Sequence, residues 1–331
     1  MTRWNGSIIG PENLPTATTA SGIWGLPEQG LSALDGIWPA PTSSRGIFGC
    51  MRSIDLLRLK TISYINIEVT GNASIFGDLT VARIQAAGCS NGTRGIFGGG
   101  DSAGVSNIIE YITIATTGNA IDFGDLTVAR ADLAACSNGT RGVFGGGAST
   151  RTTIDYVTIA SVGNATNFGS LSVGRTAPSA CSGGDRGVFG GGFAPAASNI
   201  IDYIAISTTG NATDFGDLTV ARGYLGSCSS STRGVFGGGN VGGGTTTNVI
   251  DYITIATTGN ATDFGDLTVA RQRLAACSNI TRGVFGGGTV SLASNVIDYV
   301  TIETTGNATD FGDLTEPADY LSALSGFYGT A

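Results

Sequence analysis

Short runs of apolar and β-branched residues, separated by turns rich in glycine and asparagine, repeat along the chain from residue 45 onward. In the stretch 272–315 the runs are Leu274–Ser278, Gly283–Gly286, Asn295–Ile302 and Phe311–Thr315. Turn signals about every 8–12 residues predict short antiparallel strands, here four in each repeat. No apolar stripe at helical spacing runs through the repeat, so the pattern does not favour helices.

A glycine-rich motif, Arg-Gly-Ile/Val-Phe-Gly, marks each repeat. It begins at Arg45, Arg94, Arg141, Arg186, Arg233 and Arg282, so the copies lie 49, 47, 45, 47 and 49 residues apart. A four-stranded repeat of this length is typical of one blade of a β-propeller, whereas leucine-rich repeats are shorter and helical repeats need a helical period. The Gly-Gly-Gly run after the phenylalanine would let strands approach closely near the axis and adopt positive φ; a flexible loop is the alternative.

The two ends of the repeat region complement each other. The first blade has no first strand, because Pro39–Ser44 stands where other copies have Leu-Ala-Ala-Cys-Ser. Leu321–Ser325 supplies that pattern at the other end, with Leu324 in the place of the cysteine. We therefore expect an all-β propeller of six four-stranded blades, closed by the C-terminal strand in blade 1. A seventh blade, built from 316–331 and the N-terminal arm, is the alternative.

Within blade 1 we expect the second, third and fourth strands at 46–49, 62–68 and 76–83. Residues 1–44 do not match the repeat and are predicted to form an extended arm, and 45–331 the propeller. The tryptophans all lie in the arm, at Trp4, Trp24 and Trp38. Tryptophan on an arm is typical of an anchor to a partner surface; packing on the ring itself is the alternative.

Composition excludes several functions. The net charge is −8, which disfavours nucleic-acid binding, because phosphate contacts need a basic surface. The chain has no His and no Cys-x-x-Cys pattern, so we expect neither a zinc site nor any other metal or cofactor; a calcium site on repeated aspartates is the minor alternative. No secretory signal opens the chain and no apolar run reaches about 18 residues, so no membrane span is expected.

Repeated polar residues are expected to have structural roles. Five cysteines occupy the same position of successive repeats: Cys89, Cys136, Cys181, Cys228 and Cys277. In a ring, the cysteines of neighbouring blades should lie farther apart than the Cα separation of about 7 Å that a disulfide allows. We therefore expect them to be small buried side chains near the axis. Four Asn-Ala-Thr triplets match the glycosylation rule but lie in repeated Gly-Asn turns, where a turn role is favoured: Asn164, Asn211, Asn260 and Asn307. The recurring Asp217 and Arg222, and Asp266 and Arg271, are predicted to form inter-blade pairs or turn caps.

Variation among the copies is concentrated in two kinds of loop. In a meander, the 1–2 and 3–4 loops emerge at one end of a blade and the 2–3 and 4–1 loops at the other. The 1–2 and 3–4 turns barely change, whereas the 2–3 loops and 4–1 connections differ in length and content. We therefore expect this variable end to contact a partner, with Asp101, Phe193, Asn240 and Thr289 as candidate residues. Loop variation without a role is the alternative.

The order of motifs resembles the kelch repeat of β-propellers over residues 45–325. The motifs are Leu-Ala-Ala-Cys, Val-Phe-Gly-Gly, Ile-Asp-Tyr and Asp-Leu-Thr-Val-Ala-Arg. Kelch units carry paired glycines after the second strand and a tyrosine in the third. The usual tryptophan of the fourth strand is missing, and phenylalanine fills its place at Phe76, Phe123, Phe168, Phe215, Phe264 and Phe311.

No catalytic motif stands out: there is no His base, and no nucleophile elbow, phosphate loop or dinucleotide fingerprint is convincing. We expect a non-enzymatic protein whose blades are nearly uniform. The arm motif Ser21-Gly-Ile-Trp24, the following Gly36-Ile-Trp-Pro39 and the blades together are similar to structural proteins of tailed bacteriophages, cyanophages especially.

That resemblance implies a virion component, made in the host cytoplasm: a tail, fibre or decoration protein. Its arm would dock to other virion proteins, as a homo-oligomer in the particle. Its propeller would be displayed to a host surface glycan or protein. The alternative is a lectin-like glycan-binding propeller secreted by a bacterium.

Overall fold

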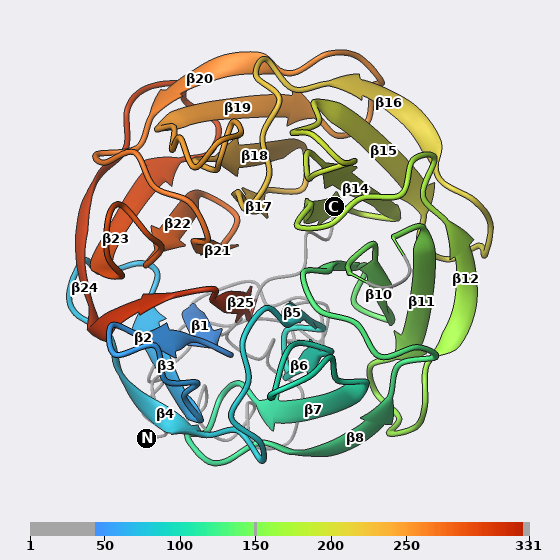
Figure 1. Ribbon diagram of the computed structural model, residues 1–331, viewed down its shortest axis with the longest axis vertical. Coiled ribbons are helices and arrows are strands. Elements are labelled where there is room, and N and C mark those ends of the chain that lie inside the picture. Colours follow the sequence, from blue (N-terminus) through green and yellow to red (C-terminus); the bar gives the residue numbers. More distant parts are fainter. Residues whose placement is uncertain (1–43, 149–150, 327–331) are drawn as a thin grey trace, which may run out of the picture. The chain divides into compact units, whose positions relative to one another are not determined.

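A computed structural model describes residues 44–148 and 151–326 of the chain. These residues form antiparallel sheets, with no helix in either range, arranged around an axis as a six-bladed β-propeller (Figure 1). The predicted fold and blade number are confirmed, and the seven-blade alternative is wrong. The predicted arm, 1–44, lies outside the described residues except for Ser44, and so do Trp4, Trp24 and Trp38.

Each blade extends from an innermost strand at the axis to an outermost strand at the rim. In that order, blade 1 contains β25 (Ser322–Ser325), β1 (Arg45–Gly49), β3 (Thr61–Asn66) and β4 (Ser74–Asp78). Blade 2 contains β5 (Ala87–Ser90), β6 (Arg94–Gly98), β7 (Ile108–Thr113) and β8 (Ile121–Asp125). Blade 3 contains β9 (Ala134–Ser137), β10 (Arg141–Gly145), β11 (Thr153–Thr158) and β12 (Thr166–Ser170).

The other three blades repeat this order. Blade 4 contains β13 (Ser179–Gly183), β14 (Arg186–Gly190), β15 (Ile200–Ala205) and β16 (Thr213–Asp217). Blade 5 contains β17 (Gly226–Ser229), β18 (Arg233–Gly237), β19 (Val249–Thr254) and β20 (Thr262–Asp266). Blade 6 contains β21 (Ala275–Ser278), β22 (Arg282–Gly286), β23 (Ser294–Thr301) and β24 (Thr309–Asp319), and the short β2 (Arg52–Ser53) adds to its outer edge.

The C-terminal strand closes the ring as predicted. β25 pairs antiparallel with β1, with Ile47 opposite Leu324 and Phe48 opposite Ala323. β2, in the loop after β1, pairs with the outermost strand of blade 6, so that the seam between blades 6 and 1 is joined by backbone pairing as well. The fourth strand of blade 1 is shorter than the expected 76–83. It ends at Asp78, and the chain then turns so that Arg83 is buried between blades.

The predicted role of the cysteines is confirmed. All six are unpaired and buried, and each repeat cysteine lies on an innermost strand against the second strand of the next blade. A Cβ added at Gly234, for example, would lie 2.7 Å from the Cys181 sulfur of the preceding blade, so only glycine fits there. Burial raises the pKa of the Cys181 thiol to about 12, so the sulfur acts as a small apolar group.

The glycine run has the structural role expected of it. A Cβ at Gly237 would lie 2.8 Å from the Phe285 ring of the next blade, and Gly238 and Gly239 adopt φ values of 65° and 116°. Close approach and left-handed backbone both exclude larger residues at these positions. The flexible-loop alternative is therefore wrong for this run.

An aromatic layer fills the outer half of every blade. In blade 5 the buried Phe264 meets Tyr252 edge-on at 6.0 Å, and the Arg233 guanidinium lies 4.3 Å from the centre of the same tyrosine ring. Arg233 Nη1 also donates to the carbonyl of Ile302 in the next blade, at 3.0 Å. The same contact joins every neighbouring pair of blades, at 2.8–3.1 Å. The phenylalanine of each fourth strand is thus buried against the tyrosine of the third.

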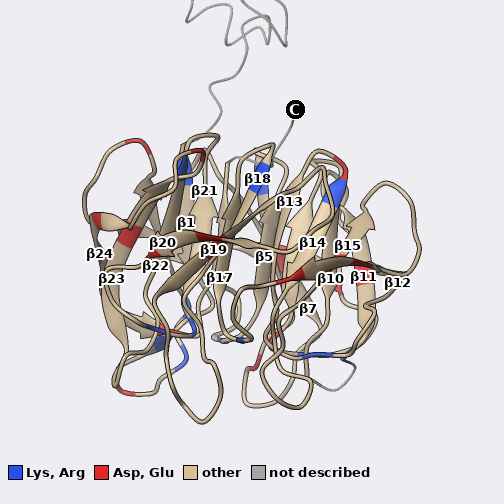
Figure 2. Cartoon of the chain, turned by 90° about the horizontal axis from the view of Figure 1, so that it is seen from above, with Lys and Arg blue, Asp and Glu red and all other residues tan. Residues whose placement is uncertain are grey.

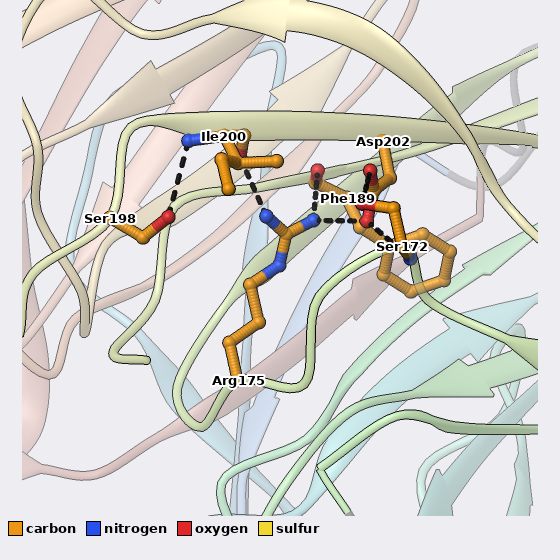
Figure 3. A network of polar contacts seen from close by, with 6 residues as sticks. All are labelled: Ser172, Arg175, Phe189, Ser198, Ile200 and Asp202. Atoms are coloured by element: carbon orange, nitrogen blue, oxygen red, sulfur yellow. Dashed lines mark hydrogen bonds and ion pairs between the residues drawn. The ribbon is translucent and has the colours of Figure 1, made fainter. Parts of the chain in front are cut away.

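A buried ion pair lies in five of the six inter-blade contacts. Figure 3 shows the pair between blades 3 and 4. Arg175, which follows blade 3, donates to the Asp202 carboxylate of blade 4 at 2.8 Å and to the carbonyls of Phe189 and Ile200 at 3.2 and 2.9 Å. The Ser172 hydroxyl donates to the same carboxylate. Both charged side chains are fully buried. The equivalent pairs are Arg83–Glu110, Arg130–Asp155, Arg222–Asp251 and Arg271–Asp298.

The inter-blade role expected for Arg222 and Arg271 is confirmed, with a partner from another segment. Each arginine binds the aspartate of the Ile-Asp-Tyr segment of the next blade. The backbone N–H of Asp217 instead donates to the Asn260 side chain of the next blade, at 3.1 Å. The same bond, from a backbone N–H of the fourth strand to an asparagine side chain of the next blade, recurs around the ring. The asparagine of each Gly-Asn turn therefore has a structural role.

The sixth contact, at the seam, lacks both members of the buried pair. Ala318 stands in the place of the arginine and Ser63 in that of the carboxylate, and both are fully buried. An ion pair instead lies nearer the surface, where Arg52 donates twice to the Asp319 carboxylate, at 2.9 and 2.7 Å. Removing both charges together avoids an unpaired buried ion, which is far more costly than an apolar contact.

Closure by β25 makes stability depend on the last residues of the chain. We expect deletion of 318–331 to cause aggregation or loss of cooperative thermal unfolding, because β1 would be left as an open edge. Leu324→Cys, which restores the residue found in the other blades, is the control and should fold. A truncated chain that melts at the unchanged temperature would contradict the closure.

The buried pair between blades 4 and 5 should show strong coupling. Asp251→Ser is expected to lower the free energy of unfolding by about 3–5 kcal/mol, because Arg222 would be left buried and unpaired. Adding Arg222→Met should recover part of that loss, as the uncharged seam indicates. Urea titration of the wild type, both single variants and the double variant tests this; strictly additive losses would show that the two side chains are not coupled.

Candidate functional site at the variable end of the ring

The strand order places the loops at two ends of the ring, as predicted (Figure 2). The 1–2 and 3–4 turns form one end, which we call the uniform end, and the 2–3 and 4–1 loops form the variable end. Ser44 and Gly326, which flank β1 and β25, both lie at the uniform end, where the Gly326 N–H donates to the Arg45 carbonyl. The described chain therefore enters and leaves the ring at the end opposite the variable loops.

Six equivalent residues of the 4–1 connections encircle the axis at the variable end; we call them the mouth ring. Each has a left-handed backbone, with φ between 51° and 60°, and each N–H donates to the carbonyl of the preceding member, at 2.8–3.1 Å. The backbone bonds close into a complete circle. The members are Gln85, Asp132, Ala177, Tyr224, Arg273 and Tyr320. Non-glycine residues are uncommon in this conformation, and such strain is found preferentially at functional sites.

A second set of equivalent residues, the loop ring, follows the glycine runs at the start of the 2–3 loops. Its members are Arg52, Asp101, Ala148, Phe193, Asn240 and Thr289. The four predicted candidates Asp101, Phe193, Asn240 and Thr289 are therefore brought to equivalent positions. Each forms a β-bridge with the 4–1 connection of the mouth ring: with Ile84, Thr176, Gly223 and Gln272, respectively. The two rings are thus one connected surface.

Three members of the mouth ring and two of the loop ring form a continuous stack of aromatic and guanidinium groups, which we call the stacked arc. The Arg52 guanidinium lies 4.7 Å from the centre of the Tyr320 ring, and Arg273 lies 4.3 Å from the same ring. Arg273 also lies 5.2 Å from the Tyr224 ring, which meets Phe193 at 5.4 Å. Each contact between a cation and a ring restricts both partners, so the arc is preorganised.

The other half of the mouth ring carries the carboxylate. Burial raises the pKa of Asp132 to about 6, although a hydrogen bond with Gln85 and the positive charge of Arg273 oppose the shift. Arg273 belongs to blade 6 and Asp132 to blade 3, on opposite sides of the ring. The Nε of Arg273 is buried without a hydrogen-bond partner. The mouth ring therefore contains one acidic residue, Asp132, and one basic residue, Arg273, and the Arg273 Nε forms no hydrogen bond with Asp132.

Behind the mouth ring, a narrow channel of about 180 Å³ runs between the innermost strands. Its lining consists mainly of serine, alanine, glycine and cysteine. The Ser137 hydroxyl donates to the Ser90 carbonyl at 2.7 Å, and the bond is repeated from blade to blade by Ser90, Ser182, Ser229 and Ser278. These hydroxyls are committed to the protein backbone, so the channel wall offers less binding chemistry than the mouth.

Exposed apolar side chains gather beside the mouth on three adjoining blades, and we call this surface the apolar lip. It consists of Ile54, Leu56 and Leu57 of blade 1, Val290 and Leu292 of blade 6 and Val105 of blade 2. Leu56, Leu57 and Leu292 are 67%, 62% and 64% exposed. The Arg58–Asp101 ion pair at 2.9 Å ties the blade 1 loop to blade 2. An ordered loop that exposes several large apolar groups is typical of a contact surface.

No protein-family model matches the chain, and no curated protein matches it either. Within residues 44–148 and 151–326, no group of three or more His, Cys, Asp or Glu side chains is placed to hold a metal ion. The same part of the chain contains no helix long and apolar enough to span a membrane.

Sequence reasoning found most of the variable end but not its organisation. It singled out four members of the loop ring and noted that the 4–1 connections differ. The structure adds that one residue of each 4–1 connection joins a closed ring at the mouth. Arg52 and Tyr320 were missed. Tyr320 stands directly before Leu321, as Arg273 stands before Leu274, and this alignment was the available signal.

The raised pKa predicts how Asp132 affects stability. The folded state binds the Asp132 proton more tightly than the unfolded state does, so stability should fall as pH rises from the usual aspartate value of about 4 to about 6. Asp132→Asn should therefore melt at a higher temperature than the wild type at pH 7.5, and the gain should shrink at pH 4.

Asp101→Asn is the control for this experiment. Against the effect of burial, N–H groups of Gly104 and Ala103 and the Arg58 guanidinium lower the pKa of Asp101. Its ionised form is stabilising, so the Asn variant should melt lower at pH 7.5. Thermal melts of the three proteins at both pH values measure this; equal shifts for the two variants would contradict the assignment.

Proposed function

We propose that this protein is a non-enzymatic binding protein that attaches to a larger assembly from the uniform end and presents the variable end to a partner. In line with the resemblance, the assembly is the virion of a tailed phage, with the protein as a tail, fibre or decoration component built of kelch-like blades. One observation carries the proposal. Equivalent positions of the mouth ring hold unlike side chains, whereas the buried positions of the same blades are almost identical.

The fold itself does not require this variety. Ala177 has the same backbone conformation and the same N–H bond as the other members of the mouth ring, so the ring closes with a methyl group at that position. Ionised Asp132 even opposes folding, since burial disfavours its charge. Side chains that are unnecessary or unfavourable for stability, gathered on one exposed end, are typical of a surface selected for recognition.

The positions of the chain ends support a separation of two contacts. Ser44, where the described chain begins, lies at the uniform end. The arm with Trp4, Trp24 and Trp38 continues from there, outside the described residues. In the proposal the arm docks to other virion proteins, with several copies in the particle, and leaves the variable end accessible.

The apolar lip favours a protein surface as one of the contacts of the variable end. Large apolar groups exposed in neighbouring loops stabilise a complex when they are removed from water. The alternative function, a lectin-like bacterial propeller, is favoured by the polar groups of the mouth ring. Both functions use the same end of the ring and differ in where the protein resides.

Mass spectrometry of purified virions tests the proposal. We expect the protein to be present in many copies per particle. Trp24→Ala with Trp38→Ala should abolish incorporation but leave the melting temperature of the ring unchanged, because the arm supplies the docking contact. Leu56→Asp with Leu57→Asp, at the opposite end, is the matched control and should be incorporated normally.

Absence of the protein from the particles would show the virion assignment to be wrong. Normal incorporation of the double tryptophan variant would show that the arm is not the docking element.

A further inference from the structure

We propose that the mouth ring binds an uncharged saccharide, seated between the carboxylate of Asp132 and the guanidinium of Arg273. The inference rests on the proposed function, because it names the ligand class for the same variable end. The charged and hydrogen-bonding side chains of the mouth ring support it.

The charges of the mouth exclude the simpler ligand classes. Among the six members, Asp132 and Arg273 are the only charged residues, and the positive charge of Arg273 lowers the pKa of Asp132. An ion of either sign placed between them would be attracted by one residue and repelled by the other, so the pair favours neither an anion nor a cation. A neutral ligand with both donors and acceptors interacts favourably with both residues.

Hydroxyl groups match both charged groups of the mouth. The Asp132 carboxylate accepts hydrogen bonds only, whereas the Arg273 guanidinium donates only. A ligand hydroxyl can donate to the first and accept from the second. A compound with several hydroxyls on one ring supplies both kinds of bond at spaced positions, and each bond to an ionised group is stronger than a neutral one.

Planar hydrogen-bonding groups surround these two residues. The Gln85 amide lowers the pKa of Asp132, and the Asn240 amide donates to Gln272 at 2.9 Å in the connection that leads to Arg273. Burial raises the pKa of both Tyr224 and Tyr320, so each phenol keeps its proton and is available as a donor. Amide, carboxylate and phenol groups on one surface suit a polyhydroxyl ligand.

The stacked arc supplies the rigid part of the site. Tyr224 and Tyr320 lie on either side of Arg273, and Arg52 and Phe193 hold their outer sides. The rings therefore lose little freedom when a ligand binds. The two tyrosine rings hold the Arg273 guanidinium in place before binding.

A glycan array that contains both neutral and charged saccharides tests the inference with the full chain. We expect the wild type to bind neutral glycans, and Asp132→Asn and Arg273→Gln each to weaken binding at least ten-fold. Glu303→Gln removes one negative charge at the uniform end and is the matched control; its binding should equal that of the wild type. Calorimetry with a soluble glycan from the array measures the change.

Melting temperatures of all variants are measured first, and Asp132→Asn, which should stabilise the ring, remains informative if Arg273→Gln does not fold. No binding to any glycan, binding to charged glycans only, or equal binding by the wild type and Asp132→Asn would overturn the inference. A protein present in virions that binds no glycan would leave the proposed function intact. Glycan binding by a protein absent from virions would favour the lectin alternative.

Discussion

The close approach of neighbouring blades near the axis is the constraint on which the rest of the structure depends. Glycine within the second strand leaves room for the cysteine of the preceding blade, as Gly234 does for Cys181. Glycine at the end of that strand leaves room for a phenylalanine ring of the next blade, as Gly237 does for Phe285. Any larger residue would push two blades apart. Because each of these positions must fit two blades at once, the copies have little freedom to differ there.

Further out, the same contact is polar and buried. Five arginines leave one blade and pair with a carboxylate of the next; Arg175 also donates to two backbone carbonyls there. Such pairs add little net stability but allow only one arrangement, since either partner alone would be a buried unpaired charge. At the seam, where the two ends of the repeat region meet, Ala318 and Ser63 replace both partners, and β25 and β2 join the blades by backbone pairing.

This division of roles explains how a nearly uniform ring can carry a specific surface. The repeated residues hold the blades together from within, and the mouth ring is closed by backbone bonds that any residue able to adopt the left-handed conformation can make. Closure of the mouth ring therefore does not depend on which side chains its members carry. The unlike residues Asp132, Tyr224 and Arg273 face one small region of the axis, and recognition can be concentrated there without loss of the fold.

The sequence alone determined the blade, the number of blades, the closing strand and the place of the cysteines, because these follow from the period of the repeat and from short local patterns. It also placed Phe193 and Asn240 at one end of the ring. Only the tertiary structure decided that Arg222 binds Asp251 rather than the nearer Asp217, and that Arg52 and Tyr320 belong to the same stack as Arg273. The physical reason is that curvature brings equivalent residues of different blades, about one repeat apart or at opposite ends of the chain, within reach of one another's side chains. The sequence pattern shows which positions of the repeats are equivalent. Only the closed ring brings the side chains at those positions together around one axis.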